Sequence, residues 1–248
     1  MARKTSLART IPKTAIRFRS EYLDFRKGIR VGNLEDHERI TRILKLELEE
    51  RYREPFVTER YGRGAYWRWI GYLTRANRAA KPLSSHVSFG CSKFFLMVDT
   101  EEKLFKCGLQ VERGYVKAPA GSTRFLLSSD WDWHRLMKSL RPKSAMDREL
   151  NRLIQREGFW LQAGTWSEPA RFSRGNWPGV GELRKLLMKA TASEWASLQV
   201  YYPMSEDDVR ASNGVDLIEA MIAIFHEVTP AMNLCAQTPV TSEPTSIS

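Results

Sequence analysis

The chain has 248 residues, of which 42% are hydrophobic and 27% are charged, and its formal net charge is +10. This composition is typical of a globular protein with one large domain or two small ones. No apolar run approaches the roughly 20 residues of a membrane-spanning helix, and no secretory signal is found, so we expect a cytoplasmic protein without a membrane partner.

Cysteine and histidine are few and widely spaced. The three cysteines are Cys91, Cys107 and Cys235, and the four histidines form no local ligand motif with them. Such spacing argues against structural zinc and against disulfide bonds, and it fits a reducing compartment. Because the chain also lacks a Gly-rich phosphate loop, we predict no metal site and no cofactor.

The positive charge is concentrated near the N-terminus. Residues 1–31 contain nine Lys or Arg and only two acidic residues. This pattern predicts a flexible basic arm over residues 1–32, of the kind that often contacts phosphates. The alternative is a solvated terminus without a partner.

Two helices are predicted next. The first starts after an N-cap at Asn33 and ends before Pro55, and one of its faces carries apolar side chains at helical spacing: Ile40, Ile43, Leu44 and Leu48. Residues 61–81 read YGRGAYWRWIGYLTRANRAAK. Their i, i+3, i+4, i+7 spacing predicts a second helix with an inward stripe of Tyr66, Trp69, Ile70 and Leu73.

The rest of the chain mixes strands with helices. Residues 94–98 and 104–111 are β-rich runs around the polar turn DTEEK and predict a hairpin. The following pattern predicts helices at 130–140, 145–157 and 180–190, strand and loop at 159–179, a strand at 195–204, and a long helix after Ser205. We therefore expect one α+β domain at 33–235, with a small antiparallel sheet covered by helices, and a disordered tail at 236–248.

Three segments resemble a family of uncharacterised bacterial and fungal proteins, catalogued as a domain of unknown function. In KPLSSH, Pro82 and His86 are similar to a family segment that precedes a hairpin. KFFLMVDTEEKLFKCGLQV resembles that hairpin with its closing Gly108, and NWPGVGELRKLLMKA resembles a Pro-containing helix start. The resemblance covers residues 75–235. It implies a single α+β domain and supplies no activity, and residues before 75 lack the family's Asn-Asn and Trp-Phe signature.

The basic and aromatic stretch is the leading candidate site. Nucleic-acid binding needs cations for the phosphates and aromatic rings for unpaired bases. The stretch offers both, and the candidate residues are Arg60, Arg63, Arg68, Tyr72, Arg75, Arg78 and Lys81. This favours a basic nucleic-acid-associated module. The alternative interpretation of the same residues is a core helix with a solvated basic edge.

Two other functions remain open. If the ends of the 94–111 hairpin meet, His86, Glu112 and Arg113 could form the cleft of a small enzyme of unknown reaction, with histidine as general base. More often, such groups form a structural ion pair at a sheet edge. The third possibility is a protein-interaction scaffold that binds through exposed aromatic residues.

Overall fold

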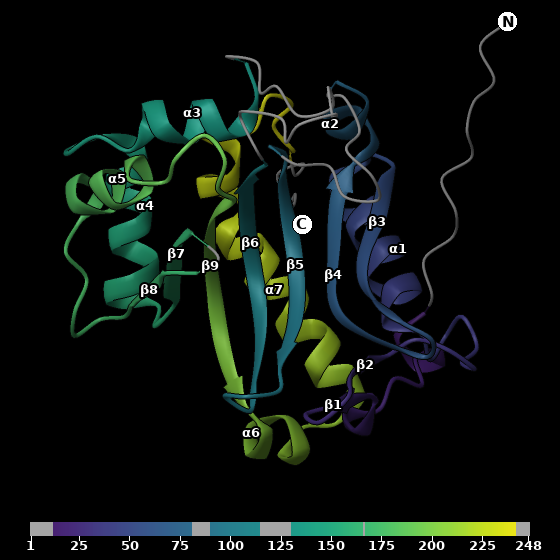
Figure 1. The fold of residues 1–248 in the computed structure, drawn as a ribbon. Helices are drawn as coiled ribbons and strands as arrows, with labels where there is room; N and C mark the ends of the chain where they lie inside the picture. The colour runs from purple at the N-terminus through teal and green to yellow at the C-terminus, as the bar shows by residue number, and fades with distance from the viewer. Residues whose placement is uncertain (1–11, 81–89, 115–129, 166, 242–248) are drawn as a thin grey trace, which may run out of the picture.

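A large antiparallel sheet forms the centre of the molecule (Figure 1). The structure is a computed structural model, and it describes residues 12–80, 90–114, 130–165 and 167–241. Within these residues lie nine strands: β1 (Leu23–Asp24), β2 (Gly28–Arg30), β3 (Phe56–Arg63), β4 (Tyr66–Thr74), β5 (Ser92–Asp99), β6 (Leu104–Arg113), β7 (Trp160–Thr165), β8 (Pro169–Phe172) and β9 (Ala196–Ser205). Their order is β1-β2-β4-β5-β6-β9-β7-β8, and β3 pairs with β4 off this path.

The same described ranges contain seven α-helices: α1 (Ile40–Tyr52), α2 (Arg75–Ala79), α3 (Asp132–Ser139), α4 (Ala145–Asn151), α5 (Val180–Met188), α6 (Glu206–Ala211) and α7 (Gly214–Asn233). A π-helical segment, Arg152–Arg156, extends α4. In Figure 1, α7 runs behind the sheet, and α3, α4 and α5 gather beside β7 and β9. The expected mixture of helices with an antiparallel sheet is confirmed, but the sheet is much larger than predicted.

The main hydrophobic core lies between α7 and the sheet. Asn213 caps α7 by accepting hydrogen bonds from two backbone N–H groups. The helix then buries a stripe at helical spacing: Leu217, Ile218, Met221, Ile224, Phe225 and Val228. Phe225 stacks on Phe94 of β5 with ring centroids 4.7 Å apart. The side chains of alternate strand positions meet this helix, so the face of the sheet toward α7 is apolar.

Most elements after residue 90 are confirmed. In the hairpin of β5 and β6, Phe94 pairs with Leu109, and the Asp99 carboxylate accepts hydrogen bonds from the backbone N–H groups of Glu101 and Glu102. The helices predicted at 130–140, 145–157 and 180–190 and the strand at 195–204 are present. The helix expected after Ser205 is two helices, because Ser205 caps α6 and Asn213 caps α7.

The helix predicted through residues 66–73 is wrong, because this stretch forms strand β4. It pairs with β3 in register from Phe56↔Thr74 to Tyr61↔Trp69, and the hairpin turns at Gly64 with φ 61°. From Trp69 onward both faces of β4 are buried, so its apolar residues do not alternate with polar ones. The match to a helical stripe is therefore coincidental.

Residues 12–32 belong to the fold, in contrast to the flexible arm expected for them. They supply seven buried apolar side chains: Ile16, Phe18, Tyr22, Leu23, Phe25, Ile29 and Val31. Arg210 of α6 donates hydrogen bonds to the carbonyls of Ser20 and Leu23 at 3.0 and 3.2 Å. The basic side chains between the buried ones lie at the surface or half-buried. The rest of the expected arm, residues 1–11, lies outside the described residues.

The start of the predicted tail is also part of the fold. Ala236 and Val240 are buried, and the side chain of Asn233 exchanges two hydrogen bonds with the backbone of Val240. The buried Asp132 carboxylate accepts a hydrogen bond from the Gln237 N–H at 2.7 Å. The first helix likewise differs, since α1 begins at Ile40 and not after Asn33. Residues 242–248 lie outside the described part of the chain.

Candidate functional site

The turn of the β3–β4 hairpin carries a basic and aromatic surface. We call it the hairpin end and define it as Lys27, Arg60, Tyr61, Arg63, Tyr66, Trp67 and Arg68. Gly62 and Gly64 have positive φ angles of 152° and 61°, which side chains rarely adopt, and they let the chain reverse. The register between the strands shifts between Tyr61 and Gly62. Such a bulge re-aims the side chains that follow it.

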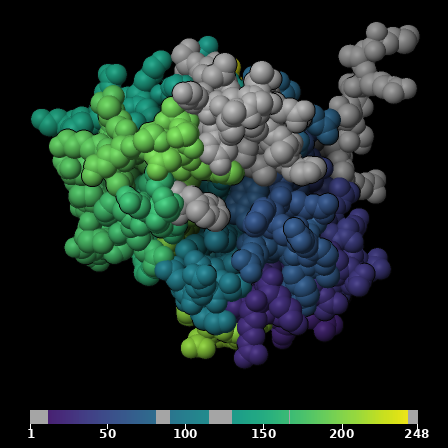
Figure 2. All heavy atoms as spheres, viewed as in Figure 1, coloured from purple at the N-terminus to yellow at the C-terminus, as the bar shows by residue number. Residues whose placement is uncertain are grey.

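Cations at the hairpin end lie over aromatic rings. The Arg60 guanidinium is 4.4 Å from the centroid of the Trp67 ring, and the Lys27 ammonium is 5.5 Å from that of Tyr66. Arg60, Arg63 and Arg68 are exposed and form no ion pair with any described residue. Figure 2 shows the blue surface of the hairpin beside the purple surface of the first strands, which bring Lys27 to it. The result is a local excess of positive charge.

The seven residues predicted as one nucleic-acid surface do not lie together. Tyr72 is fully buried, and burial raises the pKa of its hydroxyl well above the usual value. Arg75 is exposed, but it follows the far end of β4, about 20 Å along the strand from Arg68. Arg78 lies 3.9 Å from the buried Glu59. Lys81 lies outside the described residues. Arg60, Arg63 and Arg68 remain together at the hairpin end.

The predicted enzyme cleft is not assembled by its two described members. Glu112 and Arg113 are consecutive residues of β6, so their side chains point to opposite faces of the sheet. Glu112 lies 3.4 Å from the Lys93 ammonium, and burial raises the pKa of its carboxyl against the effect of that lysine. Arg113 donates hydrogen bonds to the carbonyls of Ala190, Thr191 and Glu194 beyond α5. His86 lies outside the described residues.

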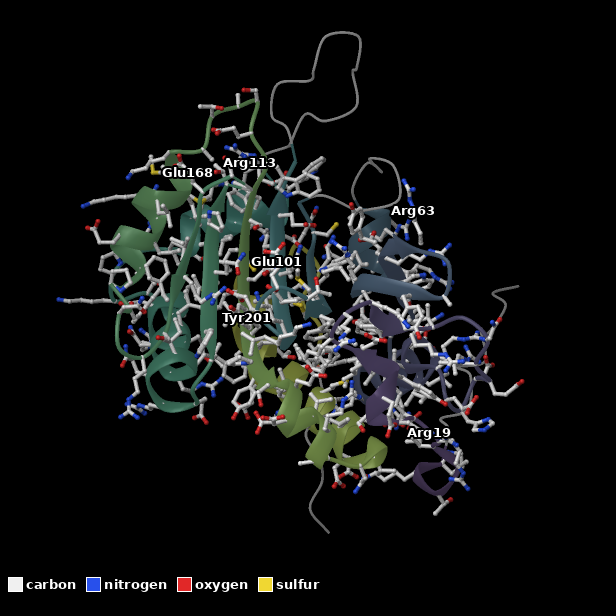
Figure 3. All side chains as sticks on the ribbon, turned by 60° about the horizontal axis from the view of Figure 1, so that its bottom comes forward. Arg19, Arg63, Glu101, Arg113, Glu168 and Tyr201 are labelled. Carbon is white, nitrogen blue, oxygen red and sulfur yellow. The ribbon has the colours of Figure 1, made fainter. Side chains whose placement is uncertain are left out.

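Arg113 thus has a structural role. Its guanidinium ties the end of β6 to the loop before β9, and burial lowers its pKa while the charge of Glu194 opposes that change. Figure 3 shows Arg113 and Arg63 in different parts of the molecule. Arg113 is therefore not part of the hairpin end.

The face of the sheet away from α7 carries a buried ionic network. Lys93 is fully buried, with its ammonium 3.0 Å from a Glu59 oxygen and 3.4 Å from a Glu112 oxygen. Burial lowers the pKa of the Lys93 ammonium, but the charges of Glu59 and Glu112 have the larger effect and raise the pKa above its usual value. Lys93 therefore stays protonated at neutral pH and cannot act as a nucleophile. Buried charges are tolerated when they are paired in this way.

A second group of charges lies further along the same face. Lys106 is 2.8 Å from Asp99 and 3.1 Å from Glu102, and its ammonium is 5.2 Å from the centroid of the Tyr201 ring. Burial raises the pKa of Tyr201 to about 12, although the nearby Arg171 guanidinium lowers it. The Tyr201 hydroxyl forms no hydrogen bond with a described residue.

Sequence reasoning missed part of the hairpin end. It identified three of its arginines, but it placed Lys27 in a separate arm and Tyr66 in the core. The signal that could have found the arrangement is the spacing Gly62-Arg63-Gly64, because two glycines around one residue between aromatic runs indicate a hairpin turn. Of the side chains that the structure describes, no three His, Cys, Asp or Glu gather as metal ligands would.

Comparisons with known proteins add no family. Neither the scan against protein-family models nor the search of curated proteins finds a match to this chain. The resemblance to the uncharacterised family stays a prediction. Within the described part of the chain, no helix combines the length and apolar character needed to cross a bilayer.

Proposed function

We propose that the protein binds nucleic acid through the hairpin end. The observation that supports this most is the set of three exposed arginines, Arg60, Arg63 and Arg68, which have no carboxylate partner among the described residues. The Arg60 guanidinium also lies over the Trp67 ring. Glu59 is the hairpin's single acidic residue, and it is buried against Lys93. The exposed part of the hairpin is therefore purely cationic.

Unpaired arginines of this kind are suited to phosphate oxygens. A guanidinium donates several hydrogen bonds in a fixed plane, and that plane matches the oxygens of a phosphate. Some cations elsewhere on the described surface lie beside carboxylates, as Arg53 does with Glu50 and Lys185 with Glu182. Others, such as Arg141, Arg148 and Arg156, have no carboxylate partner among the described residues. The hairpin end differs because three arginines without a carboxylate partner lie at one hairpin, with the Arg60 guanidinium over the Trp67 ring. Its fourth cation, Lys27, lies 3.9 Å from the Asp24 carboxylate.

The test is the salt dependence of binding. Each phosphate that a cation neutralises releases condensed counterions, so the slope of log affinity against log salt counts the contacts, at about 0.9 per contact for duplex DNA and about 0.7 for a single strand. The variant with Arg60, Arg63 and Arg68 all changed to Ala should lose about two to three from this slope. Fluorescence anisotropy with a labelled oligonucleotide at several salt concentrations measures it.

A matched control removes the same charge elsewhere. Arg141, Arg148 and Arg156 are exposed arginines on the α3–α4 side of the molecule, and changing all three to Ala should leave the slope unchanged. An unchanged slope in the hairpin variant, or an equal loss in the control, would overturn the proposal. The proposal also fails if the wild type binds vesicles of anionic lipid at low salt but binds no oligonucleotide.

A further inference from the structure

We infer that the ligand of the hairpin end is a single strand and that Tyr61 is the platform on which one of its bases stacks. This inference rests on the proposed nucleic-acid binding and names the class of nucleic acid and the residue that selects it. Tyr61 is 66% exposed, the highest value among the large hydrophobic residues of the described chain.

The three aromatic rings of the hairpin end differ in what covers them. The Arg60 guanidinium lies over Trp67, and the Lys27 ammonium lies over Tyr66. No cation and no other aromatic ring of the described residues lies against Tyr61. A base can stack only on a ring with a free face. Among these three rings, Tyr61 is therefore the one that is ready to receive a base.

The position of Tyr61 is fixed by the backbone and not by packing of its own ring. It pairs with Trp69 across the hairpin, directly before the bulge at Gly62. Gly62 has a positive φ, and a Cβ added there would press against the backbone of Trp67, so the two strands approach closely at this point. The ring thus projects from a hydrogen-bonded strand and not from a loop. A residue whose backbone is already paired loses less entropy on binding than one in a flexible loop.

The placement of the cations favours a flexible ligand. Arg60 and Tyr61 are neighbours in β3, so their side chains point to opposite sides of the hairpin. A single strand can bend around the hairpin and bring a phosphate to Arg60 while a base stacks on Tyr61. In a duplex the bases are already stacked on each other, and Tyr61 would meet no free base.

The experiment compares two ligands and three proteins. Wild type, Tyr61→Ala and Tyr61→Phe are titrated against labelled oligothymidylate of about 12 nucleotides, within the range of known single-strand sites, and against a duplex of equal length. Removing the ring should weaken single-strand binding by about 5- to 150-fold, which corresponds to the loss of one stacked base. Duplex binding should change less than about twofold, and Tyr61→Phe should keep single-strand affinity because the phenyl face remains.

Two further measurements separate the ways in which the idea can fail. Tyr202→Ala removes another exposed tyrosine, on β9, and should affect neither ligand. If the wild type binds the single strand with the expected salt slope but Tyr61→Ala weakens both ligands equally, the stacking inference is overturned and the proposed function stands. A wild type that prefers the duplex overturns the single-strand inference alone. If the wild type binds neither ligand, both the inference and the proposed function fall.

Discussion

Replacing Lys93 by methionine tests the buried network, because methionine keeps most of the volume of the side chain and removes only its charge. Lys93 is fully buried and lies within 3.4 Å of both Glu59 and Glu112. Without it, two carboxylates share the site with Arg78, which lies 3.9 Å from Glu59. Removing one partner of a buried pair typically costs about 3–5 kcal/mol of unfolding free energy. The structure sets a tighter upper limit on the unfolding free energy that Lys93→Met can lose.

The limit comes from proton uptake by Glu112, whose pKa is already raised by burial. In an unfolded chain a glutamate titrates near pH 4.3, and protonating it costs about 1.4 kcal/mol per pH unit above that value. Protonation of Glu112 would therefore limit the loss of unfolding free energy in Lys93→Met to about 3.7 kcal/mol at pH 7 and to about 1 kcal/mol at pH 5. A carboxyl whose pKa is raised in the folded protein contributes stability at pH values below its pKa in the unfolded chain. That contribution is lost as the pH rises through its pKa in the folded protein. The free energy of unfolding of Lys93→Met should accordingly fall further below that of wild type at pH 7 than at pH 5.

Urea denaturation of wild type and Lys93→Met at pH 5 and pH 7 measures this difference. Adding Glu112→Gln to the variant should recover part of the loss at pH 7, since it removes one carboxylate that lacks its cation. Lys185→Met changes an exposed lysine and should stay within about 0.5 kcal/mol of wild type at both pH values. A loss below about 1 kcal/mol at pH 7, or an equal loss at both pH values, would refute the reasoning about the network.

Two other predictions concern the fold itself. Gly108→Ala should prevent β6 from pairing with β9, because the added Cβ would clash with the carbonyl oxygen of Val200. Denaturation followed by circular dichroism should show a loss of about 3 kcal/mol or more in unfolding free energy. Gly175→Ala is the control and should behave as wild type, because its Cβ meets nothing within 4 Å. Deleting residues 1–31 should abolish the cooperative thermal transition, because it removes seven buried side chains and two strands; a truncated protein that melts near the wild-type midpoint would mean that these residues are not part of the core.

The sequence predicted elements well where one physical signal dominated. The β5–β6 hairpin has β-rich runs on both sides of Asp99, whose side chain accepts two backbone hydrogen bonds in the turn. The helices after residue 130 have polar outer faces and a clear apolar stripe. In these segments, local propensity and burial indicate the same structure.

The prediction failed where burial on both faces removed the alternation of a strand. Trp69, Ile70 and Leu73 of β4 are all buried, although Trp69 faces away from the main core and Ile70 faces into it. A run of this kind fits a helix and a strand equally well. The prediction of a flexible arm before residue 32 failed for another reason. Net charge is a property of the exposed basic side chains, whereas the side chains buried between them, such as Phe18 and Leu23, form part of the core.

The candidate site was partly predictable. The exposed arginines were identified from charge alone, and the placement of Tyr72 among them was wrong because it followed from the incorrect helix. The separation of Glu112 from Arg113 could have been foreseen, because adjacent residues in the predicted strand point to opposite faces. The pairing of Glu59 with Lys93 could not, since it requires the order of the strands in the sheet, which no local signal specifies.

The position of α7 has a consequence for how the chain folds during synthesis. This helix closes the apolar face of β5 and β6, yet it begins about 100 residues after the end of β6, which a ribosome adds in about 5 to 20 s. The segment of residues 12–31 waits even longer for α6, which supplies the Arg210 hydrogen bonds to Ser20 and Leu23. Throughout that interval α7 is missing from the apolar face of β5 and β6, and α1 covers only part of that face, where Tyr52 stacks on Phe94. Chaperones that shield nascent apolar strands should therefore matter more for the yield of this protein than its final stability does.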